Sequence, residues 1–341
     1  MHDLPRSLFV GATLLAAAAA QTHVISPRGL DTVPGGNTTG YPWGYAATQQ
    51  FRYQQIHDDM AGTPQVLLGM AVRRKETGAA YPAISPTLQV DLSTAAVGSQ
   101  SATSTFATNH GADRTVVMAA RQVNFPAVNP PAAGFTAPFT YVLMFDAPWF
   151  FGGQGSLCWE VLMTANNYLS GATLNLDLAQ NNLARNQAYG QTCGGTLTGS
   201  YAAPFLNQTL AGVAPNSLAI LALGYDNRSY FSVPLPLDLT GAGAPGCALY
   251  MAPVLFVTAP TSASGTARFA LDVSSLPLSA VIHSQALVPD TSNALGLVFS
   301  NGLYATPQMA RTFMRNWTSN TAAATGSLQL IYTLVTDFIE P

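Results

Sequence analysis

Short runs of alternating apolar and polar residues dominate the chain after its first twenty residues, and helix-like periodicity is scarce. Runs rich in Val, Leu, Thr, Phe and Tyr are separated by clusters of Gly, Pro and Asn, a pattern typical of short strands joined by turns. In the first half the pattern predicts strands that include residues 66–73, 85–91, 114–125, 139–145 and 158–164. Apolar side chains on both faces of 114–125 indicate a strand inside a sandwich.

A second series of strands follows the polar stretch 166–191, and we place a domain boundary near residue 187. The predicted strands are 217–225, 230–235, 247–251, 254–258, 265–273, 281–288 and 295–300. Seven short strands with frequent turn signals favour a β-sandwich. The connections are too short for crossover helices, which disfavours a parallel sheet.

The last 36 residues, 306–341, allow two interpretations. A helix that begins near Thr306 would carry Phe313 and Trp317 on one side. We favour a hairpin, because residues 327–338 are strongly strand-like and the polar stretch 318–326 would serve as its loop. The predicted fold is therefore all-β, with two jelly-roll-like β-sandwich modules in tandem, at 21–187 and 188–305, followed by a C-terminal hairpin or extension.

The first twenty residues have the composition of a signal peptide. Arg6 precedes an apolar run of about 13 residues that ends in the small residues Ala18 and Ala20, whereas a membrane span needs about 20. We predict cleavage before Gln21. No later segment is long and apolar enough to span a membrane. The mature chain is expected to be secreted or held at the cell surface.

Charge and motifs exclude several classes of function. Charged residues make up 9% of the chain, the net charge is −3, and Lys75 is the only lysine. A chain of this composition cannot form the strongly basic surface that binds the phosphates of nucleic acids. No H-E-x-x-H, P-loop, G-x-G-x-x-G or EF-hand pattern is present, so we expect no metal site and no cofactor.

Three cysteines, Cys158, Cys193 and Cys247, are distributed over the chain. Disulfides persist in exported proteins, and an odd count leaves one thiol unpaired. No C-x-x-C pair occurs, which argues against a zinc site or a redox motif.

Several short motifs follow one another between residues 189 and 303. They are Tyr189-Gly-Gln-Thr-Cys-Gly-Gly195, Pro234-Leu-Pro-Leu-Asp-Leu239, Gly243-Ala-Pro-Gly-Cys-Ala-Leu-Tyr250 and the stretch 295–302. In these motifs the chain resembles a family of secreted bacterial surface proteins that carry a C-terminal disulfide-linked β-sandwich module. The resemblance implies a Cys193–Cys247 bridge, which its loop length would make worth about 4 kcal/mol. Cys158 would then be a buried thiol.

The first module resembles the companion domain of such exported proteins at Gln122-Val-Asn-Phe-Pro126 and Pro138-Phe-Thr-Tyr141. Neither pattern implies an activity. A bacterial, exported protein is the expectation that both resemblances share.

Candidate catalytic residues are few. His57, Asp58 and Asp59 are adjacent, but neighbours on a strand point to opposite faces, so a solvated loop start is the favoured interpretation. His23, His110 and His283 lack partners at ligand spacing, and no G-x-S-x-G elbow marks a serine nucleophile. Carboxylates for glycoside hydrolysis would have to meet in space, from Asp58, Asp59, Asp113, Asp146 and Glu160. The charged run 73–76 is interpreted as a solvated turn.

Two aromatic clusters, 41–45 and 148–152, place large rings beside Pro and Gly in predicted loops. Such rings stack on sugar faces or pack into a core or an interface, and packing is the favoured interpretation. The ligand-binding candidates are Tyr41, Trp43, Tyr45, Trp149 and Phe150.

These observations favour a non-enzymatic extracellular protein with a structural, adhesive or surface-assembly role. A carbohydrate-binding, lectin-like protein is the first alternative, and it depends on the loop aromatics. An extracellular hydrolase without a local motif is the second. The expected partners are an extracellular polysaccharide or another surface protein.

Overall fold

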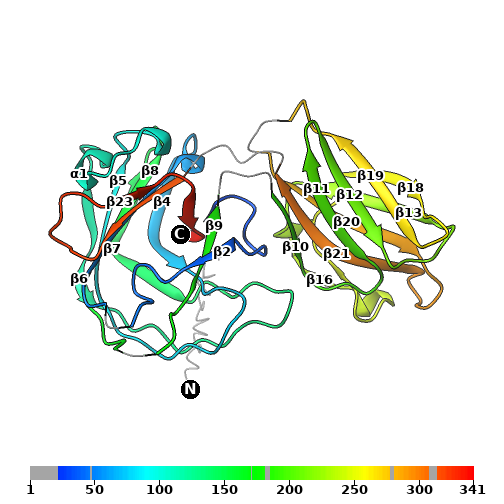
Figure 1. The fold of residues 1–341 in the computed structure, drawn as a ribbon, viewed down its shortest axis with the longest axis horizontal. Coiled ribbons are helices and arrows are strands. Elements are labelled where there is room, and N and C mark those ends of the chain that lie inside the picture. Colours follow the sequence, from blue (N-terminus) through cyan, green and yellow to red (C-terminus); the bar gives the residue numbers. More distant parts are fainter. Residues whose placement is uncertain (1–21, 47, 170, 181–184, 277–279, 307–312) are drawn as a thin grey trace, which may run out of the picture.

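The computed structural model describes residues 22–46, 48–169, 171–180, 185–276, 280–306 and 313–341. Antiparallel strands make up nearly all of its regular structure, which confirms the all-β prediction. Figure 1 shows two groups of sheets side by side. The predicted signal peptide, residues 1–20, lies outside the described residues.

The first group of sheets, here called the first unit, is built from residues 23–180 and 313–339. Its six-stranded sheet has the order β23 (Ser327–Gln329), β22 (Phe313–Thr318), β3 (Phe51–His57), β8 (Leu157–Ala165), β5 (Thr87–Thr94), β6 (Thr115–Gln122). A four-stranded sheet has the order β1 (His23–Ser26), β25 (Thr336–Ile339), β4 (Gln65–Val72), β7 (Tyr141–Phe151). A three-stranded sheet consists of β2 (Gly36–Thr39), β9 (Leu176–Gln180) and β24 (Tyr332–Leu334). Single turns of helix lie at η1 (Asp58–Met60), η2 (Ser99–Ser101) and α1 (Phe106–Asn109).

The second unit is built from residues 185–306 as a sandwich of two sheets. One sheet has the order β10 (Arg185–Tyr189), β21 (Leu297–Thr306), β20 (Ile282–Pro289), β13 (Leu218–Gly224), β18 (Leu255–Pro260). The other consists of β11 (Thr196–Ala202), β12 (Phe205–Ala211) and β19 (Thr266–Asp272). Two ribbons, β14 (Ser229–Tyr230) with β15 (Val233–Pro234) and β16 (Leu237–Asp238) with β17 (Ala248–Leu249), and the turn η3 (Thr240–Ala242) complete it.

Each unit has its own apolar core. In the first unit, alternate residues of the strands meet between the sheets, with Tyr53, Trp159 and Val161 fully buried. In the second, Leu221 of β13 and Leu210 of β12 belong to a smaller cluster between the two sheets. Both cores follow from the period-two alternation of strands, which turns every second side chain inward.

The predicted Cys193–Cys247 disulfide is confirmed, with Cα atoms 5.1 Å apart. It fastens the segment before β11 to the turn before β17, and both cysteines lie beside the buried Phe299. Cys158 is free and buried on β8.

The two units do not follow one another along the chain as a simple tandem. β1 pairs with β25, so His23 lies opposite Ile339, and β22 inserts beside β3 with Phe313 opposite His57. Residues 313–339, expected as a hairpin or extension, therefore lie in the sheets of the first unit. The division expected near residue 187 falls within β10.

A buried ion pair fixes the junction side of the first unit. Arg73 donates to Asp177 across 2.8 Å, and its other nitrogens donate to the carbonyl oxygens of Asp31 and Val33 at 2.7 Å. Arg73 and Asp177 are both nearly inaccessible to solvent. The prediction of a solvated turn at 73–76 was wrong at Arg73 and Arg74, because backbone carbonyls and a carboxylate satisfy their guanidinium groups inside the protein.

The residues that Arg73 holds also contact the second unit. Asp31 forms a 2.8 Å ion pair with Arg228, and Thr32 accepts a 2.9 Å hydrogen bond from Asn227. An apolar cluster between the units adds Leu30 and Val33 from one side and Tyr189, Tyr250 and Tyr304 from the other. The junction is therefore a packed interface of mixed polar and apolar contacts.

Both faces of β6 are partly covered, because the adjacent residues Val117 and Met118 are both buried. Among the described residues β6 is an edge strand that pairs with β5, and its other side chains are exposed. Alternation alone does not tell a central strand from an edge strand.

Removal of the disulfide should destabilise the second unit. The Cys193→Ala, Cys247→Ala variant is expected to lose about 4 kcal/mol of unfolding free energy, because the bridge closes a loop with a sequence separation of 54. Urea denaturation measures the loss. Reductant should shift the wild-type midpoint and leave the variant unchanged, and an equal shift in both would contradict the assignment.

Candidate functional site

His57 lies at the end of β3 in a closed hydrogen-bond network and not in a solvated loop, so that prediction was wrong. Its Nδ1 is 2.6 Å from Ser26 Oγ, and the indole nitrogen of Trp159 donates to its Nε2 across 2.9 Å. Ser26 Oγ also donates to Asp59 Oδ1 across 2.6 Å. Ser26 and His57 are fully buried.

The Trp159 and Ser26 contacts of His57 are both satisfied when the proton is on Nδ1. An indole nitrogen only donates, so Nε2 accepts from Trp159 and Nδ1 donates to Ser26, and the side-chain oxygen of Gln55, 3.0 Å from Nε2, then receives no proton from the imidazole. Ser26 in turn donates to Asp59. A serine nucleophile needs the opposite arrangement, in which the imidazole accepts the hydroxyl proton. The Ser26, His57 and Asp59 group therefore acts as a structural network that ties β1 to β3.

Burial sets the protonation of this network. It lowers the pKa of His57 to about 3 and raises the pKa of Asp59 to about 6, against the opposing effect of the Ser26 hydrogen bond. His57 is therefore neutral at physiological pH.

Glu160, in the middle of β8, is the centre of a second buried polar cluster. It lies opposite Gln54 of β3 on one side and Asp91 of β5 on the other. Arg52 donates to Glu160 at 3.1 and 3.2 Å, and Arg114 bridges Glu160 at 3.0 Å and Asp91 at 2.6 Å. Burial alone would raise the pKa of Glu160, but His110 and the two arginines hold that pKa below its ordinary value.

This cluster does not have the geometry of a glycosidase. The acid and the nucleophile or base must face an open cleft that holds the sugar. Glu160 is fully buried, and both its oxygens accept from side chains of the protein. We assign the cluster the role of locking α1 and the loops around it onto the outer face of the sheet.

The remaining candidate carboxylates lie apart in separate local contacts. Asp58 accepts from Ser99 and Ser156, Asp113 accepts from the backbone of Thr94, and Asp146 pairs with Arg121. Each carboxylate caps a loop or an edge strand. Among the described residues, no three His, Cys, Asp or Glu side chains gather as a metal ion would require.

The aromatic candidates divide into buried and exposed rings. Trp43 is 2% exposed and packs on Phe125 and Tyr141, while Trp149 is half-buried against Phe151. Tyr41 and Tyr45 lie together, with centroids 4.9 Å apart, and Tyr41 also stacks on Trp317. Phe150 is 65% exposed. Within the described part of the chain, no ring contact joins the first cluster to Trp149 or Phe150, and carbohydrate binding by the loop aromatics stays a prediction.

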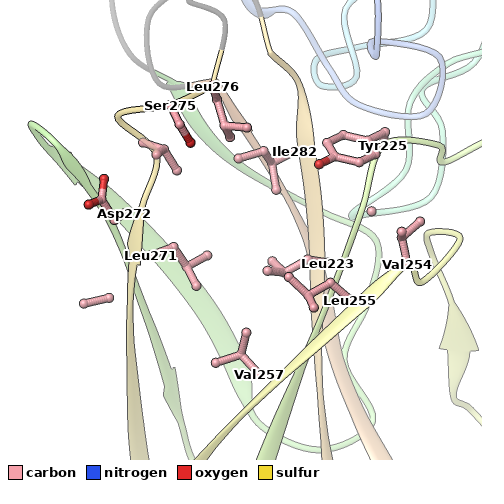
Figure 2. Close-up of a pocket in the computed structure, with 13 residues that line it drawn as sticks. Leu223, Tyr225, Val254, Leu255, Val257, Leu271, Asp272, Ser275, Leu276 and Ile282 are labelled. Carbon is pink, nitrogen blue, oxygen red and sulfur yellow. The ribbon is translucent and has the colours of Figure 1, made fainter.

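An apolar groove in the second unit was not predicted from the sequence. It has a volume of about 340 Å³. It lies between the start of β18 and the end of β19, away from the turn at 261–265 that joins the two strands. Figure 2 shows Leu223, Leu255 and Val257 facing Leu271 across this groove, with Tyr225 and Asp272 at its margins. We call it the β18–β19 groove. Its volume lies in the range of small-ligand sites, but few polar groups converge on it.

Exposed apolar side chains continue from the groove along β18. Val254, Leu255 and Phe256 are 68%, 57% and 56% exposed. β18 pairs only with β13, so its other edge is free in the described structure. A free strand edge beside an apolar groove is the arrangement by which proteins bind extended polypeptides: the backbone supplies hydrogen bonds and the groove receives side chains.

Comparison of the chain with protein-family models, curated proteins and solved structures finds no match. The resemblance to secreted bacterial surface proteins therefore stays a prediction. None of the helices in the described part of the chain is long and apolar enough to cross a membrane.

Substitution of Trp43 and of Phe150 should show which of the two rings contributes to the stability of the fold. Trp43→Ala is expected to lower the unfolding free energy by about 3–5 kcal/mol, because it empties a buried site. Phe150→Ala should change it by less than about 0.5 kcal/mol. Urea denaturation compares them, and equal stabilities would contradict the packing role of Trp43.

The neutral, buried His57 should make stability depend on pH. Between pH 6.5 and about 3 the unfolded chain binds a proton at this residue and the folded chain does not, so the contribution of His57 to stability falls as the pH falls, whereas the raised pKa of Asp59 acts in the opposite direction below about pH 6. His57→Gln should reduce that slope by about 1.4 kcal/mol per pH unit. Urea unfolding of both proteins between pH 6 and pH 4 measures it. Identical slopes would show that folded His57 titrates normally.

Proposed function

We propose that this chain is a non-enzymatic extracellular protein that serves a structural or adhesive role by holding an extended polypeptide along β18. The free, apolar edge of β18 beside the β18–β19 groove carries this proposal. An added strand would pair with β18 and place alternate side chains in the groove.

The state of the polar clusters supports a role without catalysis. Ser26, His57 and Asp59 bind one another, and Glu160 is enclosed by Arg52 and Arg114. Catalytic groups need a free functional atom in a cleft. The hydrogen-bonding atoms of these side chains are instead bonded to other groups of the protein.

The disulfide supports the extracellular part of the proposal. Disulfides persist where no thiol pool reduces them, which is the condition outside the cytosol. A thinly charged, strand-rich surface with few titratable groups also suits a protein whose task is contact with other chains.

Site-specific photocrosslinking on producing cells tests this function. A benzophenone side chain replaces Phe256 on β18, and in a matched variant it replaces Phe231, which is more exposed at 85%. We expect several-fold more polypeptide adducts from position 256, and we expect Thr258→Lys to remove them by charging the strand edge.

Labelling by random collision would give more adducts from position 231 than from position 256, because position 231 is the more accessible. Equal or greater labelling from position 231, or no polypeptide adduct from position 256, would contradict strand capture by β18.

A further inference from the structure

The backbone of β18 presents few free groups on its open edge. The register with β13 runs from Leu223 opposite Leu255 to Leu218 opposite Pro260, and the Thr261 N–H continues it by donating to Ser217. N–H and C=O groups of one residue point to the same side, and the side alternates along an antiparallel strand. Odd-numbered residues of β18 therefore face β13. Phe256 and Thr258 present N–H groups to the free edge, and Pro260 has none.

We propose that the polypeptide held by β18 is β18 of a second copy of this chain, in an antiparallel pair around a twofold axis. Phe256 lies opposite Thr258 of the second copy in this register, and Val257 lies on the axis. Both free N–H groups of each strand and the carbonyl oxygens of the same two residues are then used, in four hydrogen bonds. The inference rests on the proposed function, because it names the polypeptide that this edge binds.

Proline limits the alternative registers. Pro253 precedes β18 and Pro260 ends it, so the pairing window is as short as β18 itself. A shift that places Thr258 opposite its own copy brings Pro260 opposite Phe256, where the ring occupies the position of a hydrogen-bond donor. The register centred on Val257 avoids this contact.

Charge also favours a second copy. The six residues of β18, LFVTAP, carry no charge, so two copies meet without repulsion. Two other edge strands carry charges: β19 has Arg268 and Asp272, and β6 has Arg121. The edge strand β11, like β18, has none. Natural proteins use such charges to prevent strand pairing, and β18 lacks them. Pairing would also cover Phe256, which is 56% exposed in one copy.

Cysteine trapping tests the register in the purified mature protein. Val257→Cys places the two new thiols on residues that lie opposite each other without hydrogen bonds, about 4.5 Å apart between Cα atoms, within the range of a disulfide. Thr258→Cys places them about 8 Å apart, beyond that range. The native Cys158 is buried and the other cysteines are bridged, so they do not compete.

Under mild oxidation we expect Val257→Cys to form covalent dimers several-fold faster than Thr258→Cys. Random collision predicts the reverse order, because Thr258 is the more exposed residue. Equal rates or the reverse order would overturn the inference. Circular dichroism and the urea midpoint establish that both variants are folded.

Sedimentation equilibrium gives an independent measure. The mean mass of the wild-type protein should rise with concentration toward that of two chains. Thr258→Lys should weaken the dimer about tenfold by placing like charges near the axis. Ser200→Lys, the same change on an exposed position of β11, should leave it unaltered.

A wild-type protein that stays monomeric, or equal effects of the two lysine variants, would overturn the pairing of two copies. Photocrosslinks from position 256 to other proteins on cells would still support the proposed function in that case. A wild-type protein that stays monomeric and gives no polypeptide adduct from position 256 would contradict both proposals.

Discussion

The buried pair of Arg73 and Asp177 is the interaction on which the arrangement of the two units depends. The Asp177 carboxylate also accepts the N–H of Gly35, and the Asp177 backbone bonds to the backbones of Arg73 and Val335, so β9, the residue after β4, the link between β24 and β25, and the N-terminal segment meet at this residue. Loss of one partner would leave a buried charge uncompensated, which costs about 3–5 kcal/mol. The same segment presents Asp31 and Thr32 to the second unit. The ion pair thus fixes the surface on which the second unit packs.

The chain has few charged residues, and several of them are buried. Charged residues form 9% of the chain, yet Arg73, Arg74, Asp91, Glu160, Asp177 and Asp337 are buried. Their charges organise the interior through paired groups and backbone carbonyls. Few charges then remain for the surface, and β18 has none to protect its edge. The buried ion pairs of the first unit and the uncharged, exposed edge of the second are two sides of this distribution of charge.

Local pattern predicted the strand content and most of the strands in the second unit, because alternation and turn residues act over a few positions. It missed Phe51–His57, in which Gln54, Gln55 and His57 are buried, because polar side chains with internal partners break the apolar pattern. The resemblance, and not the pattern, predicted the correct disulfide. The β18–β19 groove depends on how two sheets diverge, and single-strand patterns carry no such information.

The pairing of β1 with β25 sets the order in which the chain can fold as it leaves the ribosome. His23 finds its partner only when Ile339 has emerged, over 300 residues later. The second unit, residues 185–306, needs no residue outside that range for its sheets and can form first. Until the last strands arrive, β3 and β4 each lack a neighbour, and their open edges are exposed to other nascent chains. Completion of the first unit is therefore the slow, late step, and a chain cut short before β22 would carry a finished second unit beside an unfinished sheet.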